Sequence, residues 1–196
     1  MASITATVLT LPTALVIGHS VQGREITALH APGPGPRVLV VGCVHGDECA
    51  ALPVIRALAR AHAREDLWLV PTLNPDGRAR GTRGNAHGVD LNRSFPSGPE
   101  PETRAAVALI RRVRPAVTVW FHQHQNLVRA WGRSMPEARR YARLAGMRFA
   151  ARRWPAGAAT RWQNERLRET SFVVELPAGR LSAAGVRRHV RAVLGL

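Results

Sequence analysis

The stretch VLVVGCVHGDECAA, residues 38–51, joins a run of apolar residues to a short polar sequence. Its first half consists of the apolar and β-branched residues that favour a buried strand. His45 and Glu48 follow directly, at the start of a segment with helical spacing of apolar residues. A strand that passes into a helix in this way begins an α/β unit. The short motif leaves two functions open for the pair: binding a metal, or forming the polar edge of a buried strand.

The composition is that of a globular protein with an unusual charge. The 196 residues suit a single domain over residues 1–196, and no apolar run approaches the roughly 20 residues that span a bilayer. The formal net charge is +15, and all 28 basic residues are arginine. These arginines are dispersed along the chain, and no nucleic-acid-binding motif accompanies them. We therefore expect neither a membrane span nor a specific nucleic-acid partner.

The N-terminal residues are mildly apolar but carry no lysine or arginine before Arg24. They lack the charged region with which a secretory signal begins. We therefore expect a cytoplasmic protein, or a mature secreted chain from which a leader has been removed. The two cysteines, Cys43 and Cys49, give no disulfide framework, and the sequence assigns them no further role.

Strands and helices are predicted to alternate along the chain. Residues 74–99 separate two of these elements and are rich in Gly, Asn, Pro and Arg without a periodic pattern; a loop of that length is usually functional. The alternation predicts an α/β sandwich with helices on both faces of a sheet. Strands are expected at residues 23–31, 37–44, 67–73, 116–122 and 171–176, and helices at 48–63, 100–113, 135–150 and 182–195.

Polar residues end three of the predicted strands, where ligands collect in such sheets. A catalytic zinc needs three protein ligands and one open position. His45 and Glu48 would supply two ligands, and either His122 or His124 the third. Glu175 ends an apolar strand, where burial would raise the pKa of its carboxyl group, so it is the natural general base.

The long loop would supply cations and amides to the same site. It contains Arg83, Asn92 and Arg93. The planar guanidinium of arginine binds carboxylates through two parallel hydrogen bonds and can stabilise an oxyanion.

Five segments, in this order, resemble the signatures of the zinc metallocarboxypeptidases, and most closely the small bacterial branch of murein peptide amidases. They are HGDE, NPDGRARGTRGN, GVDLNRSFP, FHQHQNLVRAWG and SFVVELPAG. The segment IGHSVQGREITAL, residues 17–29, also resembles that family's N-terminal pattern, so the resemblance spans roughly residues 17–180. It implies a three-layer α/β/α sandwich with a mixed, mostly parallel central sheet.

The resemblance also implies one Zn²⁺ per chain and the residues that hold it. His45, Glu48 and His122 match the family's metal ligands. Asp90 matches the acid that hydrogen-bonds the first zinc histidine and fixes its orientation.

The remaining candidates match residues that act on the substrate. Arg83 matches the arginine that polarises the scissile carbonyl, and Asn92 and Arg93 match the pair that binds the terminal carboxylate. Glu175 matches the general base. The chain departs from the pancreatic type in its mobile-loop tyrosine, because its only tyrosine, Tyr141, lies too far upstream and Trp154 is nearer the expected region.

The resemblance implies a zinc-dependent carboxypeptidase or amidase that acts on a small peptide with a free terminal carboxylate. A murein tripeptide that would release diaminopimelate is the most specific candidate. An alternative is an N-acyl amino-acid deacylase similar to aspartoacylase and succinylglutamate desuccinylase, although NPDG followed by TRGN favours the peptidase. A third is a non-catalytic module that binds peptides or polyanions, which the presence of all ligands and the base disfavours.

Overall fold

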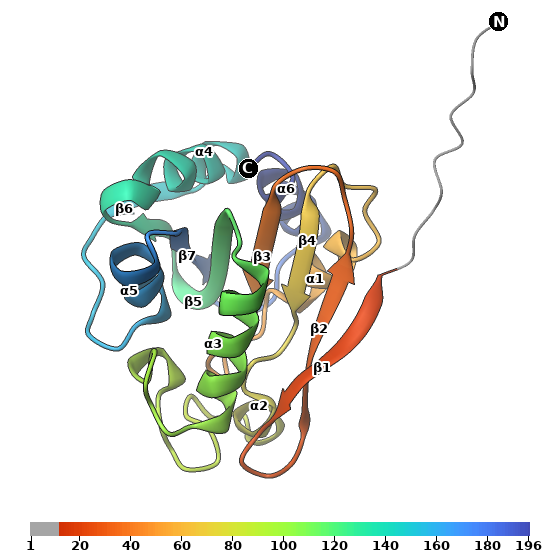
Figure 1. The fold of residues 1–196 in the computed structure, drawn as a ribbon. Coiled ribbons are helices and arrows are strands. Elements are labelled where there is room, and N and C mark those ends of the chain that lie inside the picture. The colour runs from red at the N-terminus through yellow and green to blue at the C-terminus, as the bar shows by residue number, and fades with distance from the viewer. Residues whose placement is uncertain (1–11) are drawn as a thin grey trace, which may run out of the picture.

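The computed structural model describes residues 12–196 and is built on a seven-stranded sheet (Figure 1). The expectation that no secretory signal begins the chain rests largely on residues 1–11, which lie outside the described residues. The strands are β1 (Thr13–His19), β2 (Glu25–Ala31), β3 (Arg37–Val41), β4 (Asp66–Val70), β5 (Val117–Ala130), β6 (Arg148–Ala151) and β7 (Thr170–Pro177).

The sheet is mixed and mostly parallel, as expected. Its order is β1-β2-β4-β3-β5-β6, with β7 paired to β5. The β1–β2 and β2–β4 pairs are antiparallel, whereas β3 is parallel to both β4 and β5. Residues Val38–Val41 of β3 are buried on both faces, which is typical of a central parallel strand. Each such side chain contributes about 1.5–3 kcal/mol through burial of apolar surface.

Helices cover both faces of the sheet and complete the three-layer α/β/α sandwich (Figure 1). One layer is formed by α1, α4 and α6, which contact one another through α6, and α3 lies across the other face. The helices are α1 (Leu52–Leu58), α2 (Pro75–Arg80), α3 (Pro101–Val113), α4 (Met135–Ala145), α5 (Ala159–Trp162) and α6 (Ala183–Val193). None of the helices in residues 12–196 has the length and apolar character needed to cross a membrane.

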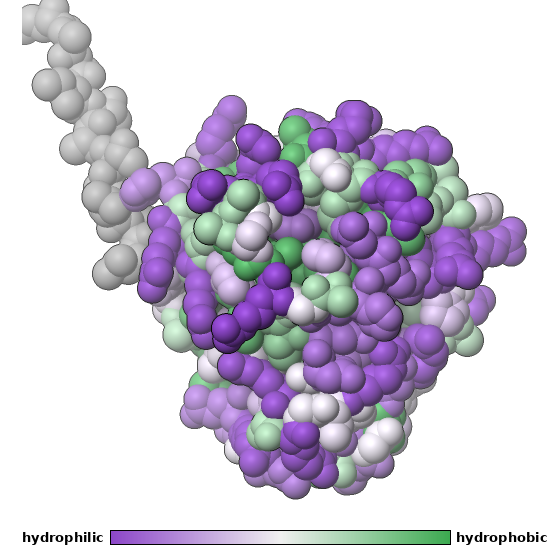
Figure 2. Space-filling model, turned by 180° about the vertical axis from the view of Figure 1, so that it is seen from behind, coloured by the Kyte–Doolittle hydropathy of each residue, from purple (hydrophilic) through white to green (hydrophobic). Residues whose placement is uncertain are grey.

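The surface of the described residues is largely hydrophilic. Polar and charged side chains are spread over the face in Figure 2, with apolar residues interspersed among them. The large hydrophobic side chains that are exposed are Val16 and Trp131. The basic residues therefore belong to a generally solvated surface.

Two predicted helices are shorter than expected. The helix expected from residue 48 begins only at Leu52, because residues 48–51 form a turn and Pro53 occupies the first helical turn. Glu48 thus lies in a turn before the helix. The helix expected over 135–150 ends at Ala145, since Gly146 adopts a left-handed φ of 66°, and β6 follows.

The loop 74–99 contains short ordered elements. Asn74 caps α2 by accepting a hydrogen bond from the backbone N–H of Gly77 (2.8 Å), and Gly81 ends the helix with a φ of 66°. The carboxylate of Asp90 similarly caps a 3₁₀ turn at Leu91–Arg93. Local capping therefore fixes the segment that carries the predicted loop residues.

The strand predicted at 116–122 continues to Ala130 because the chain reverses direction beside β7. His122 lies opposite Glu175, and after the reversal Leu127 lies opposite the same residue. Asn126, with a φ of 52°, sits in this reversal. The two halves of β5 therefore flank β7. His124 still pairs with Pro177 of β7, just before the reversal, but its side chain is exposed, whereas His122 is buried.

The structure also contains a covalent link on which the sequence analysis made no prediction. Cys43 and Cys49 form a disulfide, with Cα atoms 4.7 Å apart. The bond closes a loop around the HGDE turn. β1 and β6 were not predicted as strands either.

Candidate metal centre

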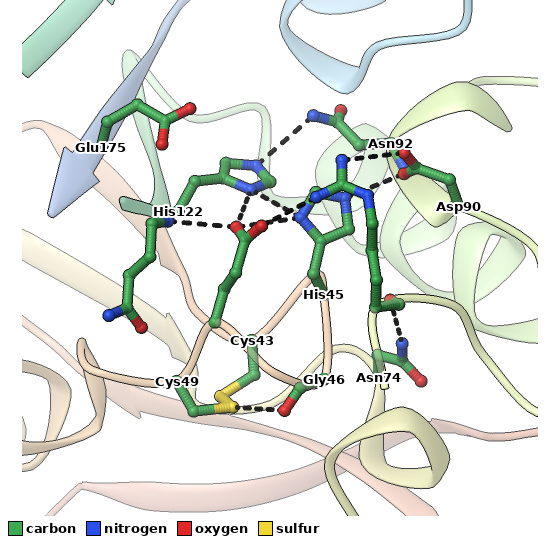
Figure 3. A network of polar contacts seen from close by, with 12 residues as sticks. Cys43, His45, Gly46, Cys49, Asn74, Asp90, Asn92, His122 and Glu175 are labelled. Carbon is green, nitrogen blue, oxygen red and sulfur yellow. Dashed lines mark hydrogen bonds and ion pairs between the residues drawn. A yellow bond between two sulfur atoms is a disulfide. The ribbon is translucent and has the colours of Figure 1, made fainter. Parts of the chain in front are cut away.

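Three side chains converge at the ends of β3 and the first half of β5 (Figure 3). The Oε2 atom of Glu48 lies 2.9 Å from the Nδ1 atoms of both His45 and His122. The two Nδ1 atoms are 3.1 Å apart. The ligand atoms of the three residues all lie within 4.8 Å of one another. Two imidazole nitrogens and one carboxylate, with further space beside them, form a donor set typical of a catalytic zinc site.

The close packing of Gly46 fixes the turn that carries the first two of these residues. A Cβ atom at this position would lie 2.0 Å from the carbonyl carbon of Gly77 in α2. The backbone N–H of Glu48 donates to the carbonyl of His45 (3.1 Å). The disulfide of Cys49 spans the same turn. The sequence HGDE thus needs glycine at its second position to present His45 and Glu48 on one side.

Asp90 orients the first histidine. Its Oδ1 atom lies 2.9 Å from Nε2 of His45. With a proton on Nε2 donated to this carboxylate, Nδ1 of His45 carries the lone pair that a metal requires. The structure therefore places Asp90 where the resemblance implied.

The surroundings of the site lower the pKa values of two of the three candidate ligands, Glu48 and His122. Burial by itself raises the pKa of Glu48, but its hydrogen bonds and charge interactions with His122 and His45 outweigh burial and bring the pKa well below its usual value. Burial also lowers the pKa of His122, which favours the neutral imidazole. An ionised carboxylate and a neutral imidazole are the forms in which Glu48 and His122 bind a metal ion. Burial by itself also lowers the pKa of His45, but the hydrogen bonds and charges of Asp90 and Glu48 outweigh burial and raise it, so a metal ion would have to displace a proton from this residue.

Arg83 reaches the site from the long loop. Its Nη1 atom lies 2.8 Å from Oε1 of Glu48, and its Nη2 atom lies 3.0 Å from Oδ2 of Asp90. Its side chain is 49% exposed. The guanidinium therefore borders the metal-binding cluster from the solvent side.

A cavity of about 140 Å³ opens beside the cluster. Seven of the eight predicted site residues line it, and Asp90 lies behind them. The predicted residues in its wall are His45, Glu48, Arg83, Asn92, Arg93, His122 and Glu175.

Glu175 lies on β7, opposite His122, and projects into this site (Figure 3). Its Oε2 atom is buried and has no hydrogen-bond partner, whereas Oε1 accepts a hydrogen bond from Nε2 of Gln125 (3.4 Å). Burial, followed by the charge of Glu48, raises the pKa of Glu175. A carboxylate in this position accepts a proton more readily than one in water.

Asn92 and Arg93 line the cavity on the side of the 3₁₀ turn. The Oδ1 atom of Asn92 accepts a hydrogen bond from the backbone N–H of Ala159 (3.1 Å), and its Nδ2 lies 3.4 Å from Nε2 of His122. Arg93 donates to the carbonyl of Asn92 (2.9 Å). Within residues 12–196 no carboxylate lies within 4.0 Å of Arg93, so its charge is available to an anion.

The structure also shows where His124, the alternative metal ligand, and Tyr141, the one tyrosine of the sequence, lie relative to the site. His124 is exposed and is not part of the ligand cluster in the described part of the chain. Tyr141 is fully buried on α4, and its hydroxyl lies 2.7 Å from Nδ1 of His189, so it does not reach the site. Trp154 does line the cavity.

Sequence reasoning missed seven residues of the cavity wall, namely Gln123, Gln125, Arg129, Pro155, Ala158, Thr160 and Val173. Arg129 carried a usable signal, because it is the one charged residue in the apolar stretch LVRAW, residues 127–131. A charge inside a buried strand calls for a partner or a ligand. The other six carried no such signal.

Comparison with protein families gives one match. The model of the succinylglutamate desuccinylase/aspartoacylase catalytic domain matches residues 34–129.

Relatives of known function include peptidases and amidases. Murein peptide amidase A of Escherichia coli (strain K12) is 32% identical over 143 residues, which cover 54% of this chain and 57% of that protein. Carboxypeptidase D of Rattus norvegicus is 34% identical over 158 residues, which cover 49% of this chain and 12% of that protein. The chain thus spans little more than half the length of the murein peptide amidases that it matches.

Solved structures share the fold over nearly the whole chain. The murein-tripeptide amidase of Escherichia coli O157 superposes with a TM-score of 0.77 at 22% identity, covering 95% of this chain and 97% of that one. A metallo-carboxypeptidase from Pseudomonas aeruginosa gives 0.71 at 25% identity, covering 90% and 61%. A succinylglutamate desuccinylase/aspartoacylase from Rhodobacter sphaeroides gives 0.71 at 23% identity, covering 96% and 66%.

Proposed function

We propose that this chain, which belongs to the metallocarboxypeptidase family in the branch of the murein peptide amidases, is a zinc-dependent hydrolase. Its substrate would be a peptide with a free terminal carboxylate, and the bond cleaved would be the last amide. The observation that carries the proposal is the convergence on one cavity of a His-Glu-His cluster, a buried carboxylate and Arg93, which has no acidic partner within residues 12–196.

His45, Glu48 and His122 would hold the zinc ion through two Nδ1 atoms and one carboxylate. Asp90 would keep His45 in the tautomer that leaves Nδ1 unprotonated. Zinc bound there would polarise a carbonyl group and lower the pKa of a water molecule to about 7. One zinc ion per chain accounts for the whole cluster.

Glu175 would act as the general base. Its raised pKa and its unpartnered Oε2 atom suit it to accept a proton from the attacking water. The same carboxyl group would then deliver the proton to the nitrogen of the departing amino acid. Arg83 would contribute its positive charge at the carbonyl oxygen, where negative charge develops.

Asn92 and Arg93 would bind the terminal carboxylate of the substrate. Arg93 has no acidic partner within the described residues, and Asn92 is held by Ala159. A carboxylate anchored there places only the last amide bond of a peptide at the metal centre. This explains why the enzyme would remove one residue from the end.

Two substrate classes fit this arrangement. A murein tripeptide that ends in diaminopimelate is favoured by the similarity to the murein peptide amidases. N-acyl amino acids are the alternative, favoured by the family model that matches residues 34–129. Both carry an amide bond next to a free carboxylate. The non-catalytic alternative is disfavoured by Glu175, whose buried Oε2 atom has no hydrogen-bond partner among the described residues.

Mass spectrometry of the zinc-loaded protein with L-Ala-γ-D-Glu-diaminopimelate tests the proposal. We expect release of diaminopimelate that stops when a chelator is added, and no release from the same peptide amidated at its terminal carboxylate. A parallel panel of N-acetyl and N-succinyl amino acids tests the deacylase alternative. If neither the tripeptide, nor ordinary C-terminal peptides, nor the N-acyl panel were cleaved, the proposed hydrolase function would be wrong.

A further inference from the structure

Arg129 lines the cavity, and neither the family motifs nor the proposed mechanism gives it a role. It lies in the second half of β5, opposite Val173 of β7. Val173 and Glu175 are two residues apart and therefore point to the same face of the sheet. Both line the cavity. Arg129 is consequently placed about 7 Å along the strand from Leu127, the residue opposite the general base, in the same wall.

The guanidinium of Arg129 is held in place by neutral groups. It lies over the ring of Trp154, 5.5 Å from the centroid, and donates a hydrogen bond to the carbonyl of Arg153. Its Nε atom is buried and has no hydrogen-bond partner. Among residues 12–196 no carboxylate comes within 4.0 Å of it. The charge is therefore positioned but not neutralised.

Three arginines line the cavity, and two of them, Arg93 and Arg129, lack an ion-pair partner within the described residues. The charge of Arg83 is matched by Glu48 and Asp90. Arg93 and Arg129, in contrast, have no ion-pair partner within the described part of the chain. Arg93 is exposed, whereas Arg129 is half-buried, and a half-buried charge without a partner is costly unless a ligand supplies the opposite charge. Burial, followed by the charge of a neighbouring arginine, lowers the pKa of Arg129, and the guanidinium still remains protonated at neutral pH.

Unpartnered polar atoms are concentrated around this cavity. Four of its lining residues each have a buried side-chain atom without a hydrogen-bond partner, whereas such groups are normally paired. They are Nε of Arg129, Nε1 of Trp154, Oγ1 of Thr160 and Oε2 of Glu175. Three of the four can donate a hydrogen bond, and all four residues are contributed by the segments that surround Arg129 and the base. The wall is suited to a ligand that accepts hydrogen bonds.

We propose that Arg129 determines specificity by binding a second carboxylate, carried by the side chain of the terminal residue of the substrate. The substrate class would then be peptides or N-acyl compounds that end in a dicarboxylic amino acid. Arg93 would bind the main-chain carboxylate and Arg129 the side-chain carboxylate. This inference rests on the proposed function for its orientation of the substrate, since the scissile amide must lie at the metal centre.

Matched substrates that differ only in the second charge provide the first test. The zinc-loaded wild-type protein is assayed with N-acetyl-Ala-Glu and N-acetyl-Ala-Gln, and with the diaminopimelate tripeptide and its side-chain amide. We expect kcat/KM to be about 10–100-fold higher for each dicarboxylic substrate, because a charge-assisted bidentate pair is lost in the amide. The difference should lie mainly in KM. Equal rates for the acid and the amide would refute the inference.

Substitutions of Arg129 test whether this residue causes the preference for the dicarboxylic substrate over its amide. Arg129→Gln should abolish the preference while leaving the glutamine substrate nearly unaffected, and Arg129→Lys should retain part of it. Arg152→Gln is the matched control, because Arg152 is exposed and does not line the cavity. It should retain the full preference. A preference that survives Arg129→Gln in a folded, zinc-loaded protein would overturn the assignment.

Binding measurements separate the inference from the proposed reaction. Isothermal titration of the zinc-loaded Glu175→Gln variant with free glutamate and free glutamine requires no turnover. We expect glutamate to bind about 10-fold or more tightly, and Arg129→Gln to remove the difference. Tighter glutamate binding without cleavage of any substrate would support Arg129 and refute the hydrolase. Cleavage of a substrate, combined with equal binding of glutamate and glutamine, would support the hydrolase and refute the role of Arg129.

Discussion

Gly46→Ala should disrupt the metal centre without touching a ligand. The added Cβ atom would lie 2.0 Å from the carbonyl carbon of Gly77, 2.2 Å from the backbone nitrogen of Arg78 and 2.5 Å from the carbonyl oxygen of Gly77. All three are backbone atoms of α2, so no flexible side chain can move aside. Either the HGDE turn or the helix must shift, and His45 and Glu48 would move with the turn.

The size of the effect follows from the severity of this contact. Overpacking a well-packed region usually costs about 1–3 kcal/mol, and contact with backbone places this substitution at the upper end, at about 3 kcal/mol. For a protein of this length such a loss lowers Tm by about 6–12 °C. Displacing the ligands should also weaken zinc binding by about 10–100-fold, as loss of supporting contacts does at other metal sites.

A second glycine supplies the control. At Gly185, in α6, an added Cβ would meet only side-chain atoms at 3.5 Å or beyond, which is ordinary contact. Gly185→Ala should therefore raise the unfolding free energy by about 0.4–1 kcal/mol and leave zinc binding unchanged. Chemical denaturation of the metal-free proteins and competitive zinc titration measure the two effects. If Gly46→Ala matched Gly185→Ala in both, the packing argument would be refuted.

Three further substitutions or conditions test other parts of the site and the fold. Glu175→Gln should bind zinc normally but lower kcat by about 10²–10⁴-fold, because only the proton acceptor is removed; zinc analysis and a peptide assay measure both. Arg93→Ala should raise KM for substrates with a free terminal carboxylate and leave amidated substrates unaffected. Burial lowers the pKa of His189 to about 4 from 6.5, so the unfolded state takes up this proton at a higher pH. The unfolding free energy should therefore fall by up to about 3 kcal/mol between pH 6.5 and pH 4. Denaturation of the metal-free protein across this range measures the effect.

Each of these expectations can fail in a distinct way. A fully active Glu175→Gln variant would show that another group accepts the proton. An equal loss on amidated substrates for Arg93→Ala would rule out a carboxylate clamp. His189→Gln should flatten the acid dependence of stability; an unchanged slope would mean that other groups cause it.

Much of the fold was predictable because the central strands are continuous apolar runs. VLVV in β3 and FVVEL in β7 can only be buried strands, and their polar termini marked the site. The helices were predicted where apolar spacing is regular. Their ends were less accurate, because Pro53 and Gly146 determine them locally.

The rest depended on tertiary contacts that no local pattern contains. The chain reversal after His124 exists because β7 pairs with both halves of β5. The disulfide between Cys43 and Cys49 forms because the HGDE turn brings two residues six positions apart together. Arg129 is recognisable as part of the site only once that reversal places it beside Glu175.

The zinc content of three proteins tests the central claim most directly. Wild type, His122→Ala and His124→Ala are loaded with zinc, dialysed, and analysed by inductively coupled plasma mass spectrometry. We expect one zinc ion per chain in wild type and in His124→Ala, and almost none in His122→Ala, because only His122 faces His45 and Glu48. A wild-type protein without zinc, or a His122→Ala variant that retains it, would contradict the metal centre.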